Sequence, residues 1–361
     1  MGPPHVRNAL DVPRVMRCVL VAVSPCVAVA LYNTGYQARA ALAAGLGASG
    51  DWRLGAFEAL GAPAHSTQPW LCAAHGATIL LPLFLSSLLG GGVAERLFAR
   101  ARGRGVDHTG LGVIALLFTL CLPPTLALWQ AALGGFLAVA VGKEIFGGFG
   151  HTFVNPPLVG LALLYFAYPD ALTADSVWVA VDGYSGATPL AAAHRGGLDA
   201  LDAAGFSWGD LLLGRVPGAL GETSALACAI GVAILLYTGV ASWRVVAGGV
   251  LGLAGAVLMI DLFVTDRPIA ELPWHWHAVA GGFAFGLVFL ATDPVTAAVT
   301  NPGRWLYGLG IGVVVVVLRV ANPAHRESVL LAILLGNVSA PLLDQLAARI
   351  QMRRGRTRDA G

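Results

Sequence analysis

The segment Asp182–Thr188, which reads Asp-Gly-Tyr-Ser-Gly-Ala-Thr, carries the residues best suited to chemistry. It lies in the longest polar stretch of an otherwise apolar chain. Thr188 offers a hydroxyl that can accept a phosphoester, and Asp182 adds an acidic group that a modifying enzyme can recognise. Small residues leave that enzyme room to approach, namely Ser185, Gly186 and Ala187. The alternative is an ordinary Asp-Gly turn followed by a loop of small residues.

This segment matches the acceptor motif Asp-x-x-(Ser/Thr)-Gly-Ala-Thr, onto which a flavin transferase attaches FMN through a phosphoester bond. The match predicts a covalent FMN on Thr188. A Gly-x-Gly-x-x-Gly fingerprint in a strand–turn–helix context is absent from the sequence, so we do not expect the chain to oxidise NADH by itself.

The composition predicts the setting of this segment. The chain has 361 residues, of which 57% are hydrophobic and 12% charged, whereas soluble domains carry about 25% charged residues. With 47 glycines and 20 prolines, it is typical of an all-α membrane protein with closely packed or broken helices. A net charge of +2 gives no indication of nucleic-acid binding.

Ten apolar stretches are long enough to cross a membrane, fewer than 20 residues sufficing where helices are broken. They are residues 15–34, 70–91, 110–123, 124–142, 155–169, 222–238, 242–264, 276–292, 304–320 and 327–348. The chain therefore divides into an N-terminal five-helix half (1–169), an external loop (170–221), a C-terminal five-helix half (222–348) and a basic tail (349–361).

Clusters of arginine flank the expected spans on one side. They are Arg7, Arg14 and Arg17 before the first span, Arg96, Arg100, Arg102 and Arg104 after the second, and Arg349, Arg353, Arg354, Arg356 and Arg358 after the last. Because positively charged loops stay in the cytoplasm, the pattern predicts cytoplasmic termini and places Thr188 outside. Arg319 and Arg326 fall on the opposite side and are too few to reverse the pattern.

Short motifs recur in the two halves. Gly134-Gly135-Phe136 precedes Asn155-Pro156 by 21 residues, and Gly281-Gly282-Phe283 precedes Asn301-Pro302 by 20 residues. Five spans per copy is an odd number, so the two copies would be inverted, and inverted repeats place their working site near the midplane. Chance is the alternative, because such motifs are common in glycine-rich membrane chains.

The chain as a whole resembles the NqrB family, the flavin-bearing membrane subunits of the bacterial sodium-translocating NADH:quinone oxidoreductases. The segments that carry the resemblance are His5–Asp11, Pro123–Leu126, Leu128–Gly134, Lys143–Gly148, Val181–Thr188, Pro273–His277, Gly281–Pro294 and Arg319–Ala324. The resemblance implies ten helices related in fold to urea and ammonium channels. It implies electron transfer from covalent FMN through non-covalent riboflavin to ubiquinone or menaquinone, coupled to Na+ export.

The resemblance also implies partners. They are the other subunits of a six-subunit complex of the bacterial inner membrane, including a periplasmic FMN subunit and a cytoplasmic subunit with NADH, FAD and 2Fe-2S sites. A flavin transferase must act on the chain as well. Family members carry a longer segment before the His-Val-Arg run, so part of the cytoplasmic cover of the quinone pocket is expected to be missing or remodelled.

Two residues match the positions expected near riboflavin, Asn155 and Thr152. The family has asparagine where Thr152 stands, and the change removes an amide that both donates and accepts hydrogen bonds. Loss of riboflavin with retention of FMN is therefore an alternative. Asn155 precedes a proline, so an ordinary helix cap is the alternative for this residue.

Gly91, Gly92 and Glu95 match the Gly-Gly-x-x-Glu element that the family places at the quinone site. The glycines would let a flat quinone head approach the backbone. The alternative is a solvated helix end at Glu95. Glu144 beside Lys143 is expected to form a local pair.

Asp293 and Asp344 match family acids linked to sodium uptake, and acids buried in lipid are functional candidates by default. A capping Asp-Pro turn and an interfacial residue are the respective alternatives. We expect no metal site. His275 and His277, two residues apart, would point to different sides of a helix, so they are expected to join Trp274 and Trp276 in an interfacial aromatic belt.

Two other functions remain open. The RnfD family, from the Rnf ferredoxin:NAD complexes, shares the flavin motif and the fold but does not use quinone as acceptor. A small-solute channel or transporter would also use an inverted repeat. The flavin motif discriminates against the channel, because a channel has no use for a flavin-bearing threonine.

Overall fold

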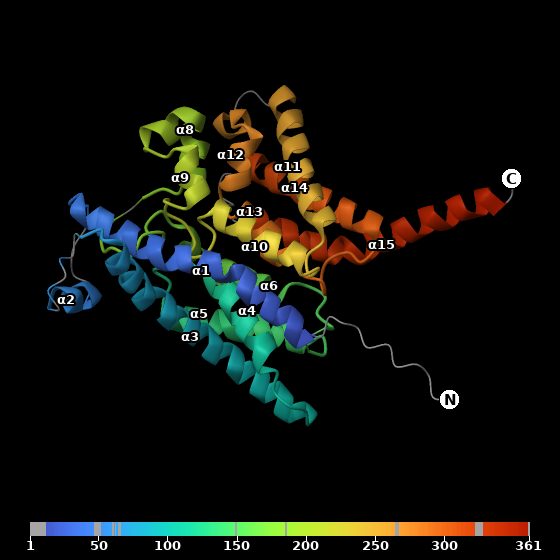
Figure 1. Ribbon diagram of the computed structural model, residues 1–361, viewed down its shortest axis with the longest axis horizontal. Coiled ribbons are helices and arrows are strands. Elements are labelled where there is room, and N and C mark those ends of the chain that lie inside the picture. The colour runs from blue at the N-terminus through green and yellow to red at the C-terminus, as the bar shows by residue number, and fades with distance from the viewer. Residues whose placement is uncertain are drawn as a thin grey trace.

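We describe a computed structural model of the chain, which covers residues 12–46, 52–59, 61, 63, 66–148, 150–184, 186–263, 267–321 and 328–359 (Figure 1). These residues are helical, without an extended β-strand. The first half contains α1 (Val12–Ala43), α2 (Trp52–Ala59), α3 (Pro69–Arg102), α4 (His108–Leu120), α5 (Leu128–Val139), the π-helix η1 (Ala140–Glu144) and α6 (Pro156–Ala167).

The rest of the chain begins with three short helices, α7 (Pro169–Thr173), α8 (Pro189–Ala203) and α9 (Trp208–Leu213). It continues with α10 (Ala225–Tyr237), α11 (Trp243–Phe263), the 3-10 helix η2 (Pro268–Glu271), α12 (Trp274–Val279), α13 (Phe283–Phe285), the π-helix η3 (Gly286–Leu290), α14 (Asn301–Ala321) and α15 (Ser328–Asp359). The polar segment 170–221 is therefore helical in part.

Five helices of the described residues are long and apolar enough to cross a membrane. They are Pro13–Ala43, Pro69–Arg102, Trp243–Phe263, Asn301–Ala321 and Ser328–Ile350, and three shorter apolar helices accompany them, Gly110–Leu120, Pro156–Ala167 and Ala225–Tyr237. The two remaining expected spans, 124–142 and 276–292, correspond to α5 with η1 and to α12, α13 and η3. The chain is a multi-pass membrane protein; ten spans and their sidedness stay predictions.

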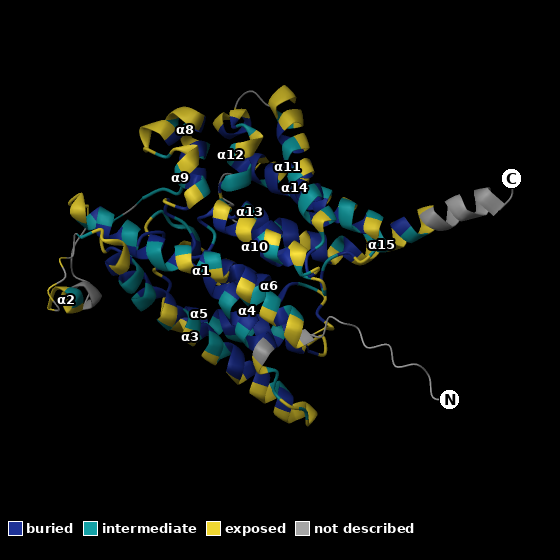
Figure 2. Ribbon diagram, in the orientation of Figure 1, coloured by how far each residue is buried: buried dark blue, intermediate teal, exposed yellow. Residues whose placement is uncertain are grey.

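Exposed and buried residues separate as lipid contact requires (Figure 2). Leu81, Leu85 and Leu89 lie four residues apart on α3 and are exposed, so they form one apolar stripe on the outside of the helix. Small residues lie between helices instead. A side chain at Gly252 would meet the backbone of Leu309, so α11 and α14 are in backbone contact, as is typical of membrane helices.

The same order of elements follows the Gly-Gly-Phe motif in each half. A π-helix comes next, then a non-helical segment, and then a helix that begins at an Asn-Pro pair: η1 and α6 in the first half, η3 and α14 in the second. π-Helices are rare and often mark functional sites. This shared order favours the two-repeat interpretation, which stays a prediction.

The expected span 276–292 is not a continuous helix. Gly281 and Gly282 adopt positive φ angles of 60° and 68°, which interrupt the helix between α12 and α13. The matching pair in the first half, Gly134 and Gly135, lies inside the regular helix α5. The interruption brings the carbonyl groups of residues 277–281 within reach of side chains from other helices.

Candidate functional site

Thr188 lies at the start of α8 and is half-buried. Its hydroxyl accepts a hydrogen bond of 3.3 Å from the backbone N–H of Ala191, so it is the N-cap, and Pro189 occupies the first helical position. Both preferences are local in origin. The hydroxyl oxygen is therefore held at the positive end of a helix, where the negative charge of a phosphoester is favoured.

The segment before Thr188 is anchored at defined points. The N–H of Gly186 donates to the carbonyl of Asp175 at 3.1 Å, and the carboxylate of Asp175 accepts a 2.8 Å bond from Arg195. The side chain of Tyr184 lies where a side chain at position 186 would be, so a larger residue there would displace the Tyr184 ring. Asp182 is exposed. The expected Asp-Gly turn is present as well, since Gly183 has a positive φ of 76°; Ser185 lies outside the described residues.

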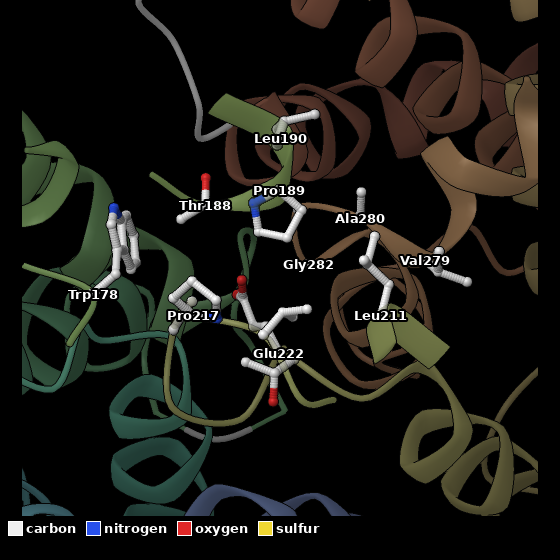
Figure 3. A pocket seen from close by; sticks show the side chains of 15 residues that line it. Trp178, Thr188, Pro189, Leu190, Leu211, Pro217, Glu222, Val279, Ala280 and Gly282 are labelled. Atoms are coloured by element: carbon white, nitrogen blue, oxygen red, sulfur yellow. The ribbon is translucent and has the colours of Figure 1, made fainter. Parts of the chain in front are cut away.

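A cavity opens beside Thr188, and its empty space, with open solvent included, measures about 590 Å³ (Figure 3). This Thr188 cavity is lined by Trp178, residues 188–190, Leu211, residues 216–219, Glu222, Thr223 and residues 279–282. The lining comes from four separate parts of the chain, and α8, α9 and α12 gather at the same end of the molecule (Figure 1).

Two polar groups in this lining are buried without a partner. The indole Nε1 of Trp178 and the hydroxyl of Thr223 have no hydrogen-bond partner among the described residues, although both side chains are less than one-tenth exposed. Such orphan groups are uncommon in proteins and call for a ligand or water. A ring with polar edges and an apolar face, such as a flavin, fits a cavity with one indole donor, one hydroxyl and mainly apolar walls.

A second cavity lies between the two halves, and its empty space, with open solvent included, measures about 530 Å³. Its lining combines α1, α4 and the start of α6 with Leu235, Val240, Phe289 and residues 292–294, and it includes Asn155 and Asp293. We refer to it as the Asn155 cavity. Asn155 is N-cap by position, yet its side chain makes no capping bond. Instead its amide donates to the carbonyl of Leu290 at 3.2 Å.

The amide oxygen of Asn155 is buried and has no partner in the part of the chain that the structure describes. The simple-cap alternative is thereby excluded. An unpaired acceptor in an apolar cavity fits a ligand that carries N–H or O–H groups, as the ring and ribityl chain of riboflavin do. Thr152 is buried, but it does not line this cavity.

Glu95 is 1% exposed, so the solvated-helix-end alternative is wrong. One of its oxygens lies 2.6 Å from the ammonium nitrogen of Lys143, and the other accepts a 3.1 Å bond from the N–H of Asp107. Lys143 also lies 3.7 Å from the Asp107 carboxylate. The expected pair with Glu144 is longer, at 3.8 Å, and Glu144 is bonded to Arg104.

Gly91 and Gly92 lie on α3 one turn before Glu95. A side chain at Gly91 would come within 3.0 Å of Leu111 and Val139, so this glycine serves close packing of α3 against α4 and α5. Gly92 has more room, with nothing nearer than 3.7 Å. The element contributes to neither the Thr188 cavity nor the Asn155 cavity.

Asp293 and Asp344 hold the same non-helical segment, residues 291–300. Asp293 accepts bonds from the N–H of Val295 at 3.2 Å and the hydroxyl of Thr296 at 3.0 Å, which is the expected Asp-Pro turn. Asp344, on α15, accepts bonds from the N–H groups of Val299 and Thr300, both at 2.8 Å. The second carboxylate therefore caps the start of α14 from a different helix.

Several residues of these sites were not predicted. Trp178, Glu222 and Thr223 line the Thr188 cavity, and their only signal was their place in or beside the external segment. Arg319 was expected to be a loop charge but is fully buried. His277 was expected in an interfacial belt and is also buried, whereas Trp274 is 42% exposed. Among the described residues, no cluster of three potential metal ligands is found.

Comparison with known proteins supports the family resemblance of the sequence. The chain matches the model of the NQR2, RnfD, RnfE family over residues 1–353. It is 46% identical over 357 residues to the B subunit of the Na(+)-translocating NADH-quinone reductase of Chromohalobacter salexigens, covering 99% of this chain and 86% of that protein. It is 46% identical to the same protein of Azotobacter vinelandii and 44% identical to that of Pseudomonas aeruginosa, covering 97% of this chain and 87% of each relative.

Proposed function

The chain belongs to the NQR2, RnfD, RnfE family, and on that premise we propose that it is the integral-membrane NqrB component of a Na+-translocating NADH:quinone reductase. In this role it carries electrons on flavins towards quinone and couples their passage to Na+ export. The observation that carries the proposal is Thr188 at the edge of a cavity that contains two buried polar groups without partners among the described residues.

Thr188 is the proposed tether of a covalent FMN, through a phosphoester at its hydroxyl oxygen. When bound, FMN supplies reversible electron transfer. Thr188 fixes the phosphate at the start of α8, while Trp178 and Thr223 offer hydrogen bonds to the polar edge of the ring. Asp182, Ser185, Gly186 and Ala187 form the segment that the flavin transferase reads.

Asn155 is the proposed contact of riboflavin, because its unpaired amide oxygen faces an apolar cavity between the halves. Thr152 contributes to this site only indirectly, through the segment that precedes Asn155. The short segment 291–294 closes the other side of the cavity. The chain thus contains two cavities that suit flavins, one beside the external segment and one where the halves meet.

Gly91, Gly92 and Glu95 are the proposed quinone element. At Gly92 the absence of a side chain leaves space next to the backbone. Glu95 supplies a buried carboxylate whose negative charge is neutralised by Lys143. Asp293 and Asp344 are proposed for the sodium path, because carboxylate and carbonyl oxygens are the ligands of hard cations and the broken segment 291–300 supplies both.

We further propose ten spans in two inverted halves, with the termini in the cytoplasm and Thr188 on the periplasmic side of the inner membrane. The partners are then the other subunits of the complex, including a periplasmic FMN subunit and a cytoplasmic subunit that oxidises NADH. The arginine clusters support this orientation. Arg319 no longer argues against it, because it is buried and not part of a solvated loop.

The test is covalent flavin attachment. The full chain is expressed with its flavin transferase, and a denaturing gel is inspected for flavin fluorescence. Fluorescence is expected for the wild type and for Thr223→Val, which alters the cavity but not the tether, and its loss is expected for Thr188→Ala. If no variant fluoresces while the transferase modifies a control substrate, the redox proposal fails and a solute channel becomes the better interpretation.

A further inference from the structure

Arg319, near the end of α14, is fully buried and all five of its N–H groups have partners. Two go to carbonyls at the end of α12: Nη1 donates to His277 at 2.7 Å and Nη2 to Ala280 at 2.8 Å. The other three partners are the Gly281 carbonyl at 3.2 Å, His277 Nδ1 at 3.4 Å and the Ser328 hydroxyl at 3.3 Å. Each of these partners is uncharged when His277 is neutral.

The contact with His277 defines the state of that ring. A guanidinium can only donate hydrogen bonds, so His277 Nδ1 must accept. His277 is then neutral, with its proton on Nε2. The hydrogen bonds of Arg319 that the structure shows are therefore all to dipoles, namely carbonyl, hydroxyl and imidazole groups.

These bonds hold one wall of the Thr188 cavity. Ala280, Gly281 and Gly282 line the cavity, and the two glycines take left-handed backbone conformations. Glycine adopts such conformations without steric cost. Because glycine adopts other conformations as readily, a further interaction is needed to stabilise this one. The guanidinium of Arg319 stabilises the observed conformation, because it binds the consecutive carbonyls of Ala280 and Gly281.

A carboxylate lies beside the same wall. Glu222 lines the Thr188 cavity, and its oxygens lie where a side chain at Gly282 would be. Arg319 Nη2 lies 3.0 Å from the position of a side chain at Gly281. In Figure 3 the Glu222 carboxylate points towards the space between Trp178 and Pro189. The glycine pair is thus close to both a buried cation and a carboxylate of the cavity lining.

We propose that Arg319 is a positioning residue of the Thr188 cavity that also sets its electrostatic potential: it holds the Gly281–Gly282 wall and offsets the charge of Glu222. The inference rests on the proposed function, since its effect is on a flavin tethered at Thr188. Reduction adds negative charge to a flavin ring. A nearby cation favours that change and a nearby carboxylate opposes it.

The two charges therefore have opposite expected effects. Arg319→Gln keeps hydrogen-bond donors but removes the charge, so the covalent flavin should become harder to reduce. Glu222→Gln removes the opposing charge and should make it easier to reduce. We expect each single change to alter the oxidised-to-reduced ratio at the wild-type midpoint about tenfold, which is about 30 mV for a two-electron couple. The double variant should lie near the wild type.

The experiment is a potentiometric titration of the covalent flavin, followed by its absorbance, in the purified complex that contains the full chain. Arg267→Gln is the matched control, because Arg267 also binds carbonyls at the end of α14, those of Val320 and Ala321, and lies outside the cavity lining. It should leave the midpoint unchanged. Arg319→Lys should retain most of the wild-type potential, because it keeps the positive charge. It should hold the Gly281–Gly282 segment less firmly, because an ammonium cannot form the five hydrogen bonds of the guanidinium.

The outcomes separate the two proposals. If the wild type carries no covalent flavin, the proposed function fails and this inference fails with it. If the flavin is present but Glu222→Gln leaves the midpoint unchanged or lowers it, Arg319 and Glu222 do not set the potential and the inference alone is overturned. Glu222→Gln keeps the test decisive even if Arg319→Gln does not accumulate, because it leaves the buried bonds of Arg319 intact.

Discussion

The side chain of Asn337, on α15, accepts a 3.1 Å hydrogen bond from the backbone N–H of Asn155, at the start of α6. The same side chain donates to the hydroxyl of Tyr307 at 2.9 Å and to the carbonyl of Thr296 at 3.3 Å. One buried amide therefore links the Asn-Pro turn of the first half to the broken segment of the second. This contact fixes the edge of the Asn155 cavity.

Replacing Asn337 with leucine should destabilise the protein. The change leaves three buried polar groups without their partner, and each such loss costs about 1–3 kcal/mol. We expect a clear fall in the midpoint of thermal unfolding in detergent and a loss of non-covalent flavin. Ser339→Ala is the control, because among the described residues Ser339 bonds within its own helix, to the carbonyl of Gly336. Equal midpoints for the two variants would refute the linking role.

Asn155→Ala should release riboflavin while leaving the covalent flavin in place. Removing the amide takes away both the unpaired oxygen and the bond to Leu290. The measurement is the ratio of flavin released by denaturation to flavin that stays on the chain, which should fall several-fold. Thr152→Ala should change this ratio little, since Thr152 does not line the cavity. A larger effect from Thr152 than from Asn155 would contradict the assignment.

Lys143→Met should be strongly destabilising. It leaves Glu95 buried without its cation, and breaking a buried pair on one side costs about 3–5 kcal/mol. The double variant Lys143→Met with Glu95→Gln should recover part of that loss, because no unpaired charge remains. Thermal unfolding measures both. Arg102→Gln is the control: Arg102 lies 3.7 Å from Glu144 and is more than one-third exposed, so its removal should cost no more than about 1 kcal/mol.

Asp344→Asn separates a structural role from a role in sodium transport. Asp344 caps α14 through Val299 and Thr300, so its charge contributes to the cap as well as to any cation path. We expect a several-fold rise in the Na+ concentration that half-activates quinone reduction. Thr300→Val removes a hydroxyl that donates to Asp344 at 2.5 Å and accepts from the N–H of Gly303 at 3.1 Å. It weakens the cap but keeps the carboxylate, so it should not raise that concentration. If both variants raise it equally, Asp344 serves the cap alone.

Local patterns determined the elements that depend on near neighbours in the chain. The long apolar helices, the Asp-Gly turn and the Thr188 cap before a proline all follow from residue type and spacing. The same holds for the Asp293 turn, whose partners are two and three residues away. These features need no information about distant segments, because their hydrogen bonds and apolar faces are set within a few residues.

Only the tertiary structure decided which side chains meet across the chain. Nothing in the order of residues places Glu222 beside Gly282, Asn337 beside Asn155, or Lys143 beside Glu95, since the two members of each pair are far apart in the chain. The sequence therefore determined an all-helical membrane chain of the NQR2, RnfD, RnfE family with Thr188 as its candidate tether. Folding decided the cavities and the charges around them, because in lipid every buried polar group must find a partner inside the protein, wherever in the chain that partner lies.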